Sequence, residues 1–472
     1  MTMFKKEFLD HLLGFRFAIS AALCLLLMIM SVIVLTGDYL ARRDEYQRNM
    51  SAYRSEAQQQ GSYFGLSRDG TKVDRPPAKL QIPAYGLEKD PDKTAAVRTA
   101  GAPRVLHELY MNPLLSLFPV ADVLFVVATV LSLLAFVVSY DAVSGEREEE
   151  TMKLLMSYSV PRARLILAKW LGGYVSLAVP FLISAGIGSV IILLANIDFG
   201  ADDWMALGLL GALSLLFLAA TFSIGLFVSC ICRYSSTSIT VLVLLWVVFV
   251  LIVPNMSPYV AAETVPVVPF SAVESEIAQE TGQAREKFHR TMRRRRRGRG
   301  RSFRAGGAET DEARQKLIEE MLNARNEMMA EIDKIEQGKL RKFTIDQNRQ
   351  VNATKKISRI SPIAAYVYAA TDIASTGTRK QQHFFQSLQE YQRQFKQYVD
   401  EKTRGIDFRR GFRDFHGGSQ DYDVSDMPVF SYQEEGTTRR VILSIWDVIL
   451  LVAYSIGFFF AAYVSFMKAD LL

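Results

Sequence analysis

Residues 139–169 read SYDAVSGEREEETMKLLMSYSVPRARLILAK and separate two long apolar runs, 120–138 and 170–194. Each run has about the 20 residues that an α-helix needs to cross a ~30 Å hydrocarbon core. Only helices and closed barrels can cross this core, because every backbone polar group must be paired within it. The sequence therefore predicts two spanning helices joined by a charged amphipathic helix, which forms a docking surface on one face of the membrane.

The composition mixes an apolar and a highly charged population of residues. Hydrophobic residues make up 50% of the 472 residues and charged residues 22%, a combination that neither a soluble enzyme nor a compact helical pore usually shows. We therefore expect an all-α polytopic membrane protein with six transmembrane helices and large soluble parts. The predicted spans are 17–36, 113–140, 170–196, 205–232, 239–257 and 441–467.

Lysine and arginine in the short loops predict the orientation, because such loops keep positive charge on the cytoplasmic side. Basic residues precede the first span, follow the second, fourth and last, and are missing from the acidic loop 197–203. Both termini are therefore expected in the cytoplasm, with the chain in a bacterial inner (cytoplasmic) membrane. Two long regions, 37–112 and 258–440, would be extracytoplasmic, and the sequence assigns no fold to the first. The short cytoplasmic segments would be 1–16, 141–169 and 468–472.

The first 16 residues carry an amphipathic pattern. Phe4, Phe8, Leu12 and Phe15 recur at helical spacing, with charged residues between them. Such a helix lies along the bilayer surface before the chain enters its first span. We expect a cytoplasmic elbow helix here.

The larger extracytoplasmic region contains two strongly helical patterns. Between 309 and 356 aliphatic residues recur every three or four positions, and between 379 and 404 an aromatic stripe does the same. The economical arrangement is a helical hairpin or bundle in which one stripe packs on the other. The alternative is an exposed face for a substrate or a periplasmic protein partner. Its residues would be Phe384, Tyr391, Phe395 and Tyr398.

A run of arginines followed by an Arg/Gly stretch separates these patterns from the fifth span. We interpret it as a solvated loop, with contact to anionic lipid head groups or to an acidic substrate as the alternative. Its extracytoplasmic position excludes nucleic acid as a partner. The run consists of Arg293, Arg294, Arg295, Arg296 and Arg297.

The spans themselves carry few ionisable groups. Ion-driven carriers need carboxylates or histidines at mid-depth, whereas Asp122 and Asp447 lie at the expected outer ends of spans, where we expect them to cap helices. The sequence also lacks G-x-x-x-x-G-K-[ST], so ATP hydrolysis would require another polypeptide. Neither the three cysteines nor the scattered histidines form a metal site or a catalytic constellation, so the chain is expected not to be an enzyme.

Residues 145–155, GEREEETMKLL, resemble the signature of ABC-2 type transporter permeases, the membrane subunits of type V ABC exporters. That family commonly shows E-R-x-x-G-T, an apolar stretch ending in Leu-Leu, a Ser/Pro/Arg stretch and Gly-Lys. Glu150 and Ala168 replace the two glycines, and we expect the helix to persist because both are better helix formers than glycine. The later residues that fit the pattern are Ser157, Pro161, Arg162 and Lys169.

The resemblance implies that this helix is a coupling helix seated in a cytoplasmic ABC ATPase subunit. ATP and Mg²⁺ would be bound by that partner and no cofactor by this chain, which would pair in the lipid bilayer with a second copy or a homologous permease. The coupling role would fall on Glu146, Arg147, Glu149, Glu150, Thr151 and Lys153.

Two weaker motifs, SPIAAYVYAATDIASTGT at 361–378 and DMPVFSY at 426–432, are similar to a subgroup with a large helical insert before the last span. Two functions are then open. The chain is half of a dimeric permease with a translocation route, or it passes the movement of the ATPases to a periplasmic partner without translocating a substrate. The substrate is not encoded in any motif that we recognise.

Overall fold

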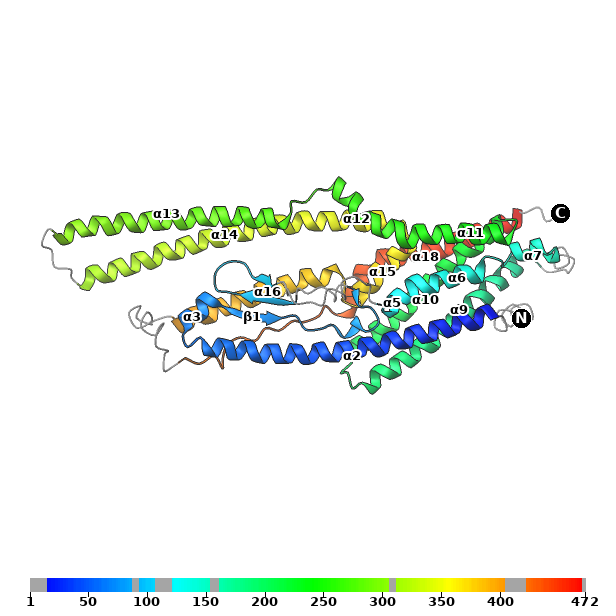
Figure 1. Ribbon diagram of the computed structural model, residues 1–472, viewed down its shortest axis with the longest axis horizontal. Helices are drawn as coiled ribbons and strands as arrows, with labels where there is room; N and C mark the ends of the chain where they lie inside the picture. The colour runs from blue at the N-terminus through cyan, green and yellow to red at the C-terminus, as the bar shows by residue number, and fades with distance from the viewer. Residues whose placement is uncertain are drawn as a thin grey trace.

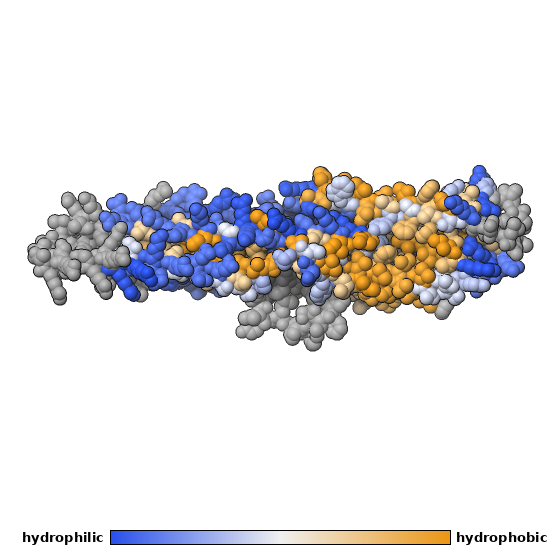
Figure 2. Space-filling view, turned by 90° about the horizontal axis from the view of Figure 1, so that it is seen from above, coloured by the Kyte–Doolittle hydropathy of each residue, from blue (hydrophilic) through white to orange (hydrophobic). Residues whose placement is uncertain are grey.

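The computed structural model describes residues 15–86, 93–106, 121–152, 161–304, 311–403 and 422–468. The molecule is elongated (Figure 1), with hydrophobic residues gathered over one part of its length and hydrophilic residues over the rest (Figure 2). Six of the described helices are long and apolar enough to cross a membrane. The predicted all-α polytopic fold is confirmed.

The six candidate spans form one bundle. The central helix is α10, with 78% of its apolar window buried, and it contacts α6, α9, α15 and α18. Glycines permit this close packing, since a Cβ at Gly225 would collide with Ser139 and one at Gly173 with the ring of Phe222. The spans are α2 (Phe15–Gln59), α5–η3–α6 (Val123–Phe125, Val126–Leu131, Ser132–Ser139), α9 (Arg162–Leu194), α10 (Ala201–Ile231), α11–η4–α12 (Ser235–Trp246, Val247–Ile252, Val253–Thr264) and α18 (Thr437–Lys468).

Two spans contain a π-helical turn, η3 in the second and η4 in the fifth. Such turns disturb the regular pairing of backbone carbonyls and are frequent at functional sites. The indole N–H of Trp246 donates to the carbonyl of Thr129 (3.3 Å) and to the hydroxyl of Ser132 (3.1 Å). The second and fifth spans are therefore joined by a side chain next to both π-helical turns.

A small mixed domain, which we call the head, continues from the first span. Helix α2 runs without a break from the bundle to Gln59 and is followed by α3 (Tyr63–Asp69), η1 (Lys79–Gln81) and an antiparallel sheet of order β1-β2-β3. Helix α16 (Thr378–Thr403) and residues 422–432 complete the head. The strands are β1 (Thr71–Asp74), β2 (Thr94–Val97) and β3 (Arg104–Leu106).

A second projection, which we call the arm, consists of α13 (Phe270–Arg304) and α14 (Asp311–Ser358) packed side by side. Val273 and Ile277 on α13 and Ile332 on α14 are buried. At 1.5 Å per residue α14 is about 70 Å long, and the arm extends past the head, away from the spans (Figure 1). The short helix α15 (Pro362–Ile373) returns the chain to the bundle.

This arrangement corrects two predictions. The aromatic stripe of α16 does not pack on the aliphatic stripe of α14, because α14 pairs with α13 and α16 packs in the head. The arginine run is not a loop either, because it lies within α13. Arginine is a good helix former, and the three glycines of this 35-residue helix cost only about 1 kcal/mol each.

Asp122 and Asp447, the two aspartates that we expected to cap spans, make different contacts. Asp122 caps α5 as predicted, accepting the N–H of Phe125 (2.7 Å), and it also accepts the N–H of Tyr85 (2.7 Å). The capping prediction is wrong for Asp447, because α18 already begins at Thr437 and the carboxylate pairs with Arg359 instead. Of the predicted elbow, residues 1–16, the first 14 lie outside the described residues and the last two begin α2.

Candidate coupling site

The coupling segment, residues 141–152, follows α6 and lies at the end of the bundle where α2 begins and α18 ends (Figure 1). Helix α7 covers Ser144–Glu148, and after a turn Thr151 and Met152 are helical again. The N–H groups of Val143 and Ser144 donate to the hydroxyl of Ser229 in α10 (3.0 and 3.1 Å). The segment is therefore attached to the central helix where α7 begins.

Arg147 extends this attachment to the end of α10. Its guanidinium donates to the carbonyls of Cys232 (3.1 Å) and Cys230 (3.3 Å). These belong to the last turn, where carbonyls lack partners within the helix and a cation is favoured by the helix dipole. Arg147 thus caps α10 and is not directed at a docking partner.

Glu146 and Glu148 reach two further spans. The Glu146 carboxylate lies 2.6 Å from the Lys169 ammonium in α9, whose side chain is only 3% exposed. Glu148 accepts the N–H of Ser235, the first residue of α11 (3.0 Å), where a carboxylate is favoured at a helix N-terminus. With Arg147, these contacts fasten the segment to α9, α10 and α11, so that a displacement of the segment acts on three spans.

The opposite face of the segment is exposed and acidic. Glu149, Glu150 and Thr151 are exposed, and the Thr151 hydroxyl donates to the carbonyl of Glu146 (3.2 Å). Glu148 lies between the two faces, since it is exposed and also accepts from Ser235. The predicted coupling residues thus fall into two groups, with Glu146 and Arg147 turned toward the spans and the others toward solvent. Lys153 lies outside the described residues.

Glu150 interrupts the predicted helix. Its φ is +60°, in the left-handed region that favours glycine, and α7 has already ended at Glu148. The expectation that glutamate preserves a helix here is therefore wrong. The glycine of the family pattern fits this backbone, and glutamate costs roughly 1–2 kcal/mol in it.

The aromatic face of α16 is buried. Exposed fractions are 2% for Phe384, 4% for Tyr391, 0% for Phe395 and 9% for Tyr398. The ring of Tyr391 stacks on Phe395 with centroids 6.2 Å apart, and Phe430 meets Tyr391 edge-on at 5.6 Å. These residues form the core of the head and offer no open surface to a substrate or partner.

The arginine run lies at the end of α13 that is farther from the spans (Figure 1). Arg293 is exposed, and the side chains of Arg294 to Arg297 are outside the description. Because α13 is about 50 Å long, the run is remote from head groups of the membrane that the spans would cross. The lipid interpretation therefore has no support from this geometry, whereas an acidic partner beyond the membrane remains compatible with it.

Sequence reasoning missed the contacts that fasten the coupling segment. Glu148 belongs to the quoted motif, but its acceptor role depends on Ser235, which is 87 positions away. Ser229 carries no sequence signal at all, since it is one of several serines in an apolar helix. In the described ranges no group of three His, Cys, Asp or Glu residues could hold a metal ion.

Comparisons with known proteins identify the family of this chain. The family model described as "ABC-2 family transporter protein" matches residues 1–471. A search of curated proteins found no match. Since the family model covers nearly the whole sequence, the chain belongs to the ABC-2 family of transporter membrane proteins and is a permease subunit of an ABC transporter.

Proposed function

We propose that this permease couples ATP hydrolysis by separate cytoplasmic ATPase subunits to export or to conformational work across the bacterial inner membrane. The observation that carries the proposal is the division of the coupling segment into an exposed acidic face and an inner face fastened to α9, α10 and α11. The exposed face is where an ATPase would dock, and the inner face is how its movement would reach the spans.

The coupling end would lie in the cytoplasm, together with both termini, and the head and arm outside. ATP and Mg²⁺ would be bound by the partner, while this chain supplies the docking surface. A second copy or a homologous permease would complete a dimer in the bilayer, as the two ATPase subunits of an ABC transporter require two docking surfaces.

One observation favours mechanical work on a periplasmic partner as the second candidate function. Helix α2 is continuous from the first span to Gln59 in the head, whereas five non-helical residues, 265–269, join the fifth span to the arm. A movement of the first span is therefore passed to the head within one helix. A channel for a small substrate does not need such projections.

The test uses the purified complex with its ATPase. We expect no ATP hydrolysis by the permease alone. Glu149→Lys reverses the charge of an exposed residue and should weaken assembly while leaving the melting temperature unchanged. Glu319→Lys, the same change at an exposed position of the arm, should leave assembly intact. ATP hydrolysis by the isolated permease, or unchanged assembly of Glu149→Lys, would contradict the proposal.

A further inference from the structure

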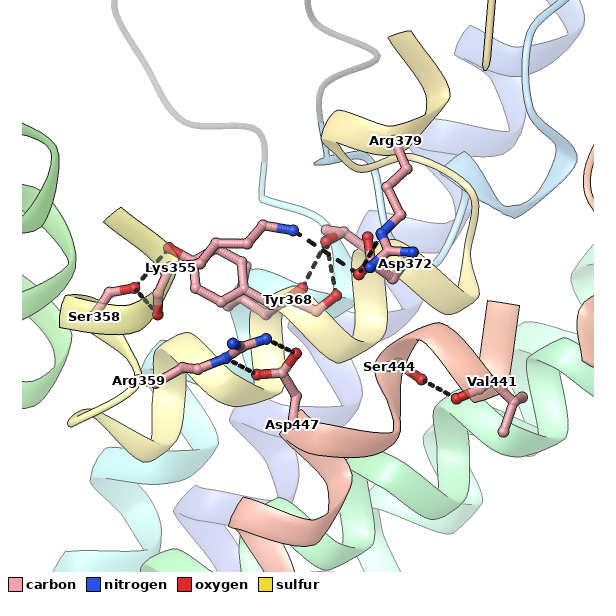
Figure 3. Close-up of polar contacts among 11 residues, drawn as sticks. Lys355, Ser358, Arg359, Tyr368, Asp372, Arg379, Val441, Ser444 and Asp447 are labelled. Carbon is pink, nitrogen blue, oxygen red and sulfur yellow. Dashed lines mark hydrogen bonds and ion pairs between the residues drawn. The ribbon is translucent and has the colours of Figure 1, made fainter. Parts of the chain in front are cut away.

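The base of the arm is fixed to the last span by an ion pair whose carboxylate is buried and whose arginine side chain is 32% exposed (Figure 3). Arg359 follows directly after α14, and its guanidinium donates to both carboxylate oxygens of Asp447 in α18, at 2.6 and 2.8 Å. The Asp447 side chain is 1% exposed. A bidentate pair of this kind fixes the orientation as well as the distance of its two partners.

Two further contacts hold the same turn, residues 359–361, which we call the joint. Seven residues after Asp447, the hydroxyl of Tyr454 donates to the carbonyls of Arg359 (3.2 Å) and Ile360 (2.7 Å). The hydroxyl of Ser361 donates to the carbonyl of Phe249 (2.8 Å), which lies in the π-helical turn η4. The joint is thus bound to the sixth span at two levels and to the fifth span at its irregular turn.

The end of α14 is also bound to α15. The hydroxyls of Ser358 and Tyr368 lie 2.8 Å apart, and the Lys355 ammonium lies 5.1 Å above the Tyr368 ring and 3.9 Å from the Asp372 carboxylate (Figure 3). Arg379 approaches the same carboxylate to 3.6 Å. These contacts prevent α14 from turning independently of α15, which itself packs on α18 and α10.

A long lever starts at this joint. If the joint turns by about 5°, the far end of a ~70 Å helix moves by roughly 6 Å. Beyond its base the arm packs on α12 and makes polar contacts with the head and with the end of the fifth span. Gln350 donates to the carbonyl of Val265 (3.0 Å), and the β2–β3 turn donates from Gly101 to Asp333 (2.6 Å) and from Ala102 to Glu336 (2.8 Å).

We propose that Arg359, Asp447 and Ser361 are positioning residues that set the direction of the arm from the fifth and sixth spans. The inference rests on the proposed function, because it names the residues through which the movement of the spans reaches the arm. An ion pair with a buried carboxylate contributes little net stability, since apolar residues of similar volume often replace such a pair at no cost. What such a replacement removes is the fixed bidentate geometry.

This difference gives a variant that folds and still tests the proposal. In the double variant Arg359→Met with Asp447→Leu, we expect an unchanged or higher melting temperature and retained ATP hydrolysis in the complex. The matched control is Lys339→Met with Glu276→Leu. It removes an ion pair of the arm itself (2.9 Å), in which the glutamate is 55% exposed, and with it the contact of Lys339 to Glu280 (2.9 Å).

The readout is the distance distribution between spin labels on cysteines introduced at Ala52 in α2 and Glu327 in α14, both exposed. In the wild-type complex and the control we expect a narrow distribution that shifts between nucleotide-free and ATP-trapped states. In the joint variant we expect a broader distribution and loss of the shift. Ser361→Ala, which removes only the contact to Phe249, should reduce the shift without abolishing it.

The outcomes separate the two proposals. If the wild-type distance does not respond to nucleotide, conformational work on the arm fails as a function, and the joint fails with it. If the wild type responds and the joint variant gives the same width and shift, the role of the joint is wrong while the proposed function stands.

Discussion

The head and the coupling segment are held to the molecule by different forces. The head has a closed core in which Phe384, Leu388 and Phe395 are at most 2% exposed. The coupling segment is held by an ion pair and by hydrogen bonds to helix ends, with little apolar burial beyond Val143 and Met152. Apolar packing resists every displacement, whereas end contacts pass a displacement on to the helices they hold. The comparison predicts that the head unfolds as a unit and that the coupling segment responds to single polar substitutions.

The largest effect should come from the core of the head. Phe395→Ala removes a fully buried ring, and we expect a loss of roughly 3–5 kcal/mol of unfolding free energy. Phe385→Ala is the matched control, because that ring is on the same helix and 47% exposed. Thermal unfolding of the full chain in detergent measures both. Equal losses for the two variants would show that α16 is not packed as described.

The next effect should come from the ion pair of the coupling segment. Lys169→Ala leaves the Glu146 carboxylate in a partly buried site without its cation, and we expect a loss of roughly 2 kcal/mol. Lys287→Ala, which breaks the exposed pair with Glu331 on the arm, should lose almost nothing. The same unfolding measurement serves here. If the Lys169 and Lys287 variants are equally stable, the contact between Lys169 and Glu146 does not hold the coupling segment to the spans.

Restoring the two family glycines should have opposite effects. Glu150→Gly relieves a left-handed backbone and should raise stability by about 1 kcal/mol. Ala168→Gly, inside α9, should lower it by roughly the same amount because glycine is a poor helix former. Melting temperatures of the two variants test this. If Glu150→Gly is destabilising, the turn at residue 150 is not as described.

The smallest effect concerns pH at the edge of the head. The hydrogen bond from the Lys402 ammonium lowers the pKa of Asp426, which also accepts from the Tyr398 hydroxyl. Because the folded pKa lies below the unfolded value of about 4, the contribution is present above that pH and is lost as pH falls through the folded pKa. Because Lys402 and Asp426 are both exposed to solvent, we expect this contribution to the stability of the fold to be small. Asp426→Asn should flatten the acid limb of the stability curve slightly, and a steeper limb would contradict the assignment.

The spans and the coupling motif could be predicted because length, apolarity and local charge are sufficient to define them. The fold of the head could not be predicted, since its strands have only three or four residues. Its core also joins α3 and β1 to α16, which lies some 300 positions later in the chain. The arginine run was misassigned because composition suggested a loop where the backbone is helical. Within the coupling motif, the inner and outer groups could not be separated, because a five-residue helix is too short to show a periodic face.

The ion pair between Asp447 and Arg359 could not be predicted either, because the two residues are far apart in the sequence. Arg359 lies 88 positions earlier, in a region whose topology relative to the last span has no signature in the sequence. Only the position of Asp447 in an otherwise apolar span was visible, and end capping was the local explanation for it. Because α18 begins at Thr437, Asp447 lies inside the helix and cannot cap it. A buried carboxylate at such a position needs a cation from another part of the chain.

The central claim is that the exposed acidic face of the coupling segment contacts the ATPase. A photo-crosslinking amino acid placed at Glu149, and for comparison at Glu319 in the arm, tests it most directly in cells that contain both proteins. The account predicts a crosslinked species of permease and ATPase from position 149 and none from position 319. A crosslink from position 319 with none from position 149 would contradict it and would place the arm, not the coupling segment, in the cytoplasm.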